Sequence, residues 1–211
     1  RAGDMRQAAA VASHLVAGQF ANADALKEAA FVAVDAGARD VVHEAAIALR
    51  TARPASGAAA LVAAFDASLA GRNAAAVAKA KQAITAGDLA ASERGIAYHL
   101  QAESYKRLGR REKAARACLA SSGEKTIAQG KLAEYSNYLL NLSYAPHAAE
   151  ELLAAAKGYG ALFEPMQVFS HTKEKHRHKR LRIGYISPDL RAHPVGTLMR
   201  PLLTAYDRTR F

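Results

Sequence analysis

The sequence predicts a mainly α-helical protein that ends in one short α/β segment. Three observations support this fold class. Half of the residues are hydrophobic (51%) and many of those are alanine, the best helix former. Glycines recur at a regular spacing, and residues 181–196 have the pattern of a strand, a polar turn and a helix start. We therefore expect an α-solenoid of stacked helix pairs, followed by the first β-α unit of an α/β domain.

Glycines mark the expected helix ends in the first 110 residues. Each of these glycines follows an alanine-rich periodic segment, which is where helices commonly end: Gly18, Gly37, Gly71, Gly87 and Gly109. Polar residues suited to N-caps stand near the expected helix starts: Asn22, Ser56, Asn73 and Asp88. The result is a series of helices joined by short turns.

The glycine spacing predicts a structural repeat. Gly37 and Gly71 are 34 residues apart, and Gly71 and Gly109 are 38 apart. A period near 34 is typical of tetratricopeptide repeats, which are helix pairs that stack into a solenoid. Pro54 lies after the second helix of its unit, where such repeats place a proline. The alternative is an alanine-rich bundle without a repeat. We assign residues 1–125 to tetratricopeptide-like repeats.

The clearest repeat unit covers residues 95–121. Ala102 and Ala114 are small enough to let its two helices approach closely, and Tyr98 and Tyr105 share one helix face. Two further helices are expected at about residues 127–142 and 146–163, so that residues 126–170 form linking helices.

Charge and composition limit the function classes. Residues 171–182 carry six Lys and Arg against one Glu, about half of the net charge of +10. No aromatic residue is interleaved for base stacking, which argues against nucleic acid as a partner. His171, His176 and His178 have poor metal-ligand spacing. We therefore expect a solvated basic linker at residues 171–180 and no metal site.

Membrane insertion and disulfides are not expected. No apolar run approaches about 18 residues, the length of a membrane span. Cys118 is the sole cysteine, so no internal disulfide can form; a cytoplasmic location fits this composition.

The pattern near the end of the chain predicts a site. Apolar residues over 181–186 favour a strand, Ser187-Pro188-Asp189 breaks it, and His193-Pro194 opens a helix. Ligands of open α/β sheets bind at the carboxyl ends of strands, beside helix N-termini. Asp189 and His193 are therefore candidates for proton chemistry. The alternative is that they only cap the helix.

Several segments together resemble one enzyme family. They are Tyr135-Ser-Asn-Tyr-Leu-Leu140, the helix with Glu150-Glu151, the motif at residues 181–196 and Tyr206-Asp-Arg-Thr-Arg-Phe211. This combination resembles the O-linked N-acetylglucosamine transferase family, in particular its bacterial SPINDLY-like members. These join tetratricopeptide repeats to a glycosyltransferase of two Rossmann-like halves. In this chain, Gly196-Thr-Leu stands where some relatives carry a second histidine.

The resemblance implies an activity. It implies inverting transfer of a sugar, N-acetylglucosamine, from a UDP-sugar to Ser or Thr of an acceptor protein recruited by the repeats, with no metal and no other cofactor. Some members of the family glycosylate Asn instead. His193 and Asp189 match the motif's histidine and acid, and the roles of base, relay and positioning group stay open between them. Ser187 and Pro194 would bind substrate.

The resemblance also sets an expectation for the chain by itself. Residues 181–211 would be an incomplete N-terminal Rossmann-like domain, so this chain would belong to a longer enzyme and be inactive alone. The alternative function is a non-catalytic module of helical repeats that binds proteins.

Overall fold

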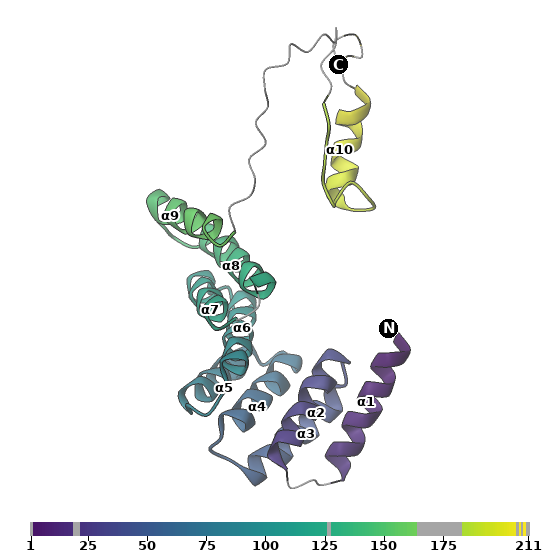
Figure 1. Cartoon of the computed structure of the whole chain (residues 1–211), viewed down its shortest axis with the longest axis vertical. Helices are drawn as coiled ribbons and strands as arrows, with labels where there is room; N and C mark the ends of the chain where they lie inside the picture. Colours follow the sequence, from purple (N-terminus) through teal and green to yellow (C-terminus); the bar gives the residue numbers. More distant parts are fainter. Residues whose placement is uncertain are drawn as a thin grey trace. The chain divides into compact units, whose positions relative to one another are not determined.

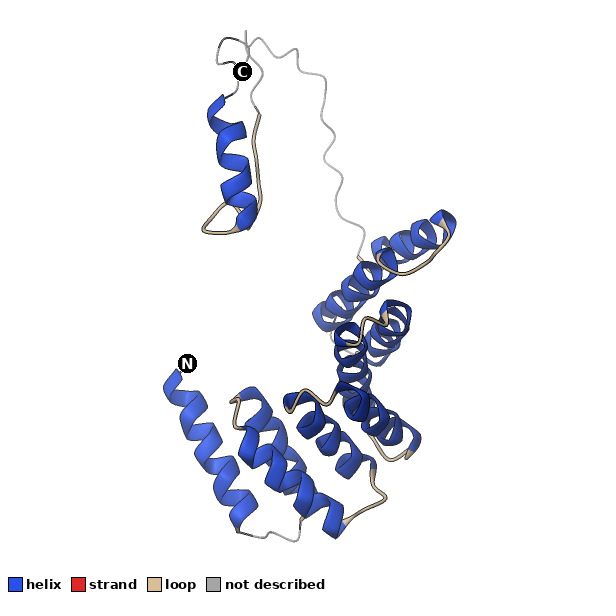
Figure 2. Cartoon of the chain, turned by 180° about the vertical axis from the view of Figure 1, so that it is seen from behind, coloured by secondary structure: helices blue, strands red, loops and turns tan. Residues whose placement is uncertain are grey.

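The protein divides into two compact units, Arg1–Pro165 and Met166–Phe211 (Figure 1). The computed structural model describes residues 2–18, 22–125, 128–163, 183–205, 207 and 209. Over these ranges the regular secondary structure is helical, and no strand is present (Figure 2). None of the helices described is both long and apolar enough to cross a membrane. The predicted basic linker, including His171, His176 and His178, lies outside the described residues.

The first unit is a succession of antiparallel helices. They are α1 (Ala2–Ala17), α2 (Ala23–Asp35), α3 (Arg39–Ala52), α4 (Gly57–Leu69), α5 (Asn73–Thr85), α6 (Ala91–Arg107), α7 (Arg111–Glu124), α8 (Ala128–Ser143) and α9 (Ala149–Gly160). Each helix packs chiefly on its neighbours in the chain, and α2, α4 and α6 also contact one another in turn. This nearest-neighbour packing is that of a helical solenoid.

The same turn closes three of the helix pairs. Between α4 and α5, Gly71 adopts φ 75°, and the N–H of Arg72 donates to the carbonyl of Ala67 over 2.8 Å. This is a Schellman turn, in which a left-handed glycine ends the helix. It recurs between α2 and α3 at Gly37 (φ 71°, Ala38 N–H to Ala33 carbonyl, 2.8 Å) and between α6 and α7 at Gly109 (φ 71°, Arg110 N–H to Tyr105 carbonyl, 2.9 Å). The predicted repetition of helix pairs is confirmed.

Alanine faces hold the helix pairs together. Ala102 and Ala114, predicted to sit at a close helix crossing, are both fully buried, and Tyr105 and Cys118 pack in the same cluster. The largest apolar side chains without exposure are Leu49, Leu61, Val42 and Val62. Small buried side chains let the helix backbones pack close together. The core is therefore filled mainly by closely packed alanine side chains and by few large ones.

Polar contacts link one helix pair to the next. The N–H of Gly57, the first residue of α4, donates to both carboxylate oxygens of Asp88, at 2.9 and 3.1 Å. The hydroxyl of Ser121 in α7 donates to the carbonyl of Gly95 in α6 over 2.8 Å. Asp88 was expected to cap the helix that follows it. That expectation is wrong, because the carboxylate instead caps α4, 31 residues earlier in the chain.

The other expected N-caps have mixed outcomes. The side chains of Asn22 and Ser56 accept N–H groups at the starts of α2 and α4, as predicted. Asn73 is instead the first residue of α5, with Arg72 at the N-cap. Further along, α9 begins at Ala149 and not at Pro146.

The second unit contains one described helix, α10 (Pro194–Ala205), where a helix was predicted. Residues 183–187 have no regular secondary structure, so the predicted strand is wrong over its described part; Leu181 and Arg182 lie outside it. A strand is held by backbone hydrogen bonds to a neighbouring strand. The described residues of this unit offer no such neighbour, and Ile186 is fully exposed. The first β-α unit is therefore not formed as expected.

The repeated turn makes a prediction about stability. Gly109→Ala should destabilise the first unit by about 1–2 kcal/mol, because an L-residue resists the left-handed region. The added methyl group meets no atom within 4 Å, so the cost lies in the backbone alone. Urea unfolding followed by circular dichroism measures it.

The matched control is Gly123→Ala, on an exposed helical position of α7 that is equally open. It should stabilise the unit by about 0.5–1 kcal/mol, because alanine favours helix. Equal effects of the two substitutions would show that the turn at Gly109 imposes no backbone constraint.

Candidate functional site

A short polar turn in the second unit carries the four site residues predicted from the sequence. The hydroxyl of Ser187 accepts the N–H of Asp189 over 3.1 Å, and the N–H of His193 donates to the carbonyl of Arg191 over 2.7 Å. Pro194 is the first residue of α10, a position where its fixed φ favours the helix and no N–H is needed. The turn therefore places Asp189 and His193 close together at the N-terminus of α10, while Ser187 is hydrogen-bonded within the turn.

His193 caps that helix in the described conformation. Its Nδ1 accepts the N–H of Val195 over 3.2 Å. The carboxylate Oδ1 of Asp189 lies 3.9 Å from the same nitrogen, which is beyond hydrogen-bond distance. An Nδ1 that accepts a hydrogen bond leaves the proton of the neutral imidazole on Nε2. His193 is thus set to donate from Nε2, and the Asp189 carboxylate is set to accept.

Both side chains are open to a ligand. Asp189 is 38% exposed and His193 40% exposed. The turn lies tightly against α10 at Gly196, where an added Cβ would collide with the backbone carbonyl of Arg191. Near this position some members of the family that the chain resembles have a second histidine, which this chain lacks. In the structure, glycine at 196 is what allows the turn to approach the helix.

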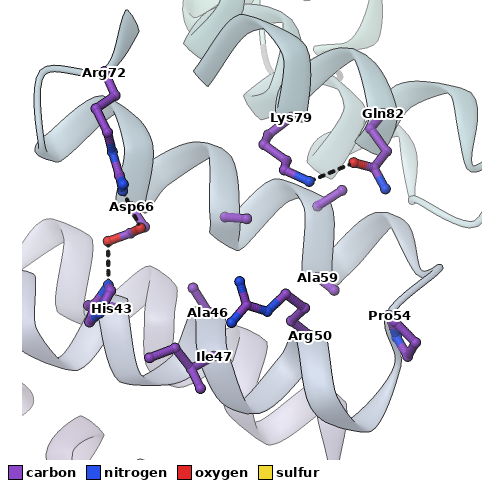
Figure 3. Close-up of a pocket in the computed structure, with 12 residues that line it drawn as sticks. His43, Ala46, Ile47, Arg50, Pro54, Ala59, Asp66, Arg72, Lys79 and Gln82 are labelled. Carbon is purple, nitrogen blue, oxygen red and sulfur yellow. Dashed lines mark hydrogen bonds and ion pairs between the residues drawn. The ribbon is translucent and has the colours of Figure 1, made fainter. Parts of the chain in front are cut away.

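A second candidate site lies in the first unit, in a pocket of about 380 Å³ between α3 and α5 with α4 at its base (Figure 3). Alanines of α4 cover the base, Ala59, Ala60 and Ala63, and Ala46 lies beside them on α3. Long polar side chains line the sides, with Arg50 on α3 and Lys79 and Gln82 on α5. The pocket therefore combines a small-residue floor with a polar rim.

One carboxylate organises an end of this pocket. Oδ1 of Asp66 lies 3.0 Å from Nδ1 of His43, and its Oδ2 accepts a hydrogen bond of 2.8 Å from Nη2 of Arg72. Both oxygens are thus occupied. Lys79 donates to the neutral amide oxygen of Gln82 over 3.0 Å, and Arg50 forms no ion pair within the described part of the chain. Positive charge therefore exceeds negative charge around the pocket.

Sequence reasoning missed this pocket. His43, Ile47 and Arg50 are spaced by four and three residues, so they share one face of a helix. That face was visible in the sequence. Its combination with Asp66 and Lys79 was not, because it requires the relative placement of three helices.

A polar cluster lies between α6 and α8, and the side chain of His99 in it is 44% exposed. Nδ1 of His99 is 2.7 Å from Oε1 of Glu134, which is only 7% exposed. The other carboxylate oxygen has no hydrogen-bond partner among the described residues. The contact with Glu134 raises the pKa of His99 against the opposing effect of burial; Glu103 adds to the rise and Lys125 opposes it. The cluster links two helix pairs.

Cys118 is buried on α7 and is not a candidate nucleophile. Burial raises the pKa of its thiol to about 12. Because the thiolate is the reactive form, this cysteine is inert at neutral pH. Within the described ranges, no group of three or more His, Cys, Asp and Glu side chains could hold a metal ion.

Comparison of the chain with protein-family models, with curated proteins and with solved structures gave no match. The resemblance noted above therefore depends on the residues quoted for it.

The His99–Glu134 contact predicts how stability changes with pH. A raised pKa in the folded state contributes stability that is complete below the unfolded pKa of histidine, about 6.5. That contribution is lost as pH rises through the higher folded pKa. Unfolding free energy measured by urea titration should therefore fall from slightly acidic to alkaline pH.

His99→Gln should flatten that decline, whereas His14→Gln, at an exposed position on α1, should leave it unchanged. An identical pH profile for His99→Gln and the unaltered protein would contradict the assignment.

Proposed function

We propose that the chain is the N-terminal part of a protein O-glycosyltransferase of the O-linked N-acetylglucosamine transferase family. In this proposal the helix pairs are tetratricopeptide-like repeats that recruit the acceptor protein, and the turn at residues 187–194 forms part of the transfer site. The observation that carries it is the placement of Asp189 and His193 side by side at the N-terminus of α10, in the order of the family's motif. The repeated helix pairs support the same proposal.

The reaction needs one proton acceptor and good placement of the reacting atoms. The acceptor hydroxyl oxygen bonds to the anomeric carbon of the UDP-sugar as the bond from that carbon to the diphosphate oxygen breaks. UDP leaves, the configuration inverts, and the hydroxyl proton passes to a base. A positioned base contributes about 10²–10⁴-fold to such a step.

The hydrogen bonds of the turn suggest how the roles are shared. Asp189 is the proton acceptor or the first group of a relay, since its carboxylate is exposed and lies too far from His193 Nδ1, at 3.9 Å, to be hydrogen-bonded to it. His193 is a positioning group that donates from Nε2 to an oxygen of donor or acceptor, because its Nδ1 is occupied by the Val195 N–H. Ser187 and Pro194 contact substrate and hold the turn in place.

A second candidate function is a non-catalytic module that binds proteins. The pocket between α3 and α5 favours it, since that pocket is formed entirely by the helical array and requires no residue of the second unit.

Sugar transfer from UDP-N-acetylglucosamine to protein tests the first proposal, using the longest natural protein that contains this chain. Asp189→Asn should reduce kcat by about 10²–10⁴-fold. His193→Asn keeps an N-cap side chain but removes the imidazole, so it should lose transfer while the thermal midpoint stays unchanged. Arg200→Gln, at an exposed position of α10 outside the motif, is the control and should retain activity.

Two outcomes would contradict the proposal. If His193→Asn retains full turnover, the imidazole serves only as a cap. If the unaltered protein transfers no sugar but still binds a protein partner, the interaction module is the better account.

A further inference from the structure

The pocket between α3 and α5 extends along α3, and we call it the channel. The residues of α3 that line it run from His43 to Arg50, a distance of about 10 Å at the helical rise of about 1.5 Å per residue. An extended chain advances about 3.3 Å per residue. The channel is therefore long enough for three or four residues of an extended peptide.

The charge of the channel favours an acidic peptide. Arg50 and Lys79 stand on opposite sides of the alanine floor (Figure 3). Asp66, the acid among the lining residues, already has one oxygen beside His43 and the other bonded to Arg72. A bound carboxylate would thus meet two uncompensated cations and no free anion. Charge complementarity favours an acidic partner over a neutral or basic one.

The alanine floor limits the size of the peptide side chains that fit. Ala59 and Ala60 are almost fully buried and Ala63 is partly exposed, so α4 presents only small side chains here and a peptide backbone can approach it closely. Ile47 and Pro54 supply apolar contacts at the sides, and Ile47 is 44% exposed. Small apolar side chains between the acidic ones suit this surface better than bulky ones.

We propose that this channel binds an extended acidic segment of a partner protein, in which Asp or Glu residues alternate with small apolar residues. Its carboxylates pair with Arg50 and Lys79, and its backbone lies over the alanine floor of α4. The inference holds whether or not the chain belongs to a glycosyltransferase, because it uses only residues of the first unit.

Fluorescence anisotropy tests the proposal with a labelled hexapeptide of alternating glutamate and alanine and its glutamine counterpart. The acidic peptide should bind, and binding should weaken as sodium chloride rises from 50 to 500 mM. The glutamine peptide should bind at least tenfold more weakly.

Substitutions locate the site. Arg50→Gln and Lys79→Gln should each weaken binding by about two- to fivefold, the range of single exposed ion pairs. Lys81→Gln, on the same helix as Lys79 but outside the channel, is the matched control and should bind as the unaltered protein does. Ala63→Leu fills the channel without changing charge and should abolish binding, with the circular dichroism spectrum retained.

Three results would overturn the proposal. One is equal binding of the glutamine peptide. Another is a loss with Lys81→Gln as large as that with Lys79→Gln, which would mean that the peptide responds only to overall positive charge. The third is unchanged binding by Ala63→Leu. None of these measurements involves sugar transfer, so their failure is distinguishable from failure of the glycosyltransferase proposal.

Discussion

The left-handed glycine between paired helices is the constraint on which the rest of the structure depends. At Gly37, Gly71 and Gly109 the same Schellman turn reverses the chain and returns the next helix against the previous one. A side chain at these positions would resist that backbone conformation. Buried alanines line the helices of each pair, from α2 to α7. The array therefore follows from a local backbone geometry that is repeated along the chain.

The pocket between α3 and α5 is a consequence of this arrangement. Helices α3 and α5 are the second members of successive pairs, and α4 lies between them as the first member of its pair. Small residues on α4 leave the space unfilled. Asp66 then fixes His43 and Arg72 at one end, while Arg50 and Lys79 give the remainder its positive character. Alanine thus has two effects: it lets the helices pack closely, and on α4 it leaves room for the pocket.

How much could be predicted from the sequence depends on the range of the interactions involved. The helix pairs were predictable because a glycine turn is decided within six residues. The role of Asp88 was not, since its carboxylate bonds Gly57 on another helix pair. The strand expected before Ser187 needs neighbouring strands, which local pattern cannot supply. Asp189 and His193 were placed correctly on a turn, but the cap that His193 forms with Val195 became clear only from hydrogen-bond geometry.

The most direct test of the repeated turn is residue-resolved hydrogen exchange by NMR. The amides of Ala38, Arg72 and Arg110 each follow a turn glycine and donate back across the turn. If the same turn closes all three helix pairs, these amides should be protected far beyond the rates of an unstructured chain. Exchange of any one of them at the unstructured rate would contradict the account, because that pair would lack the turn that holds its helices together.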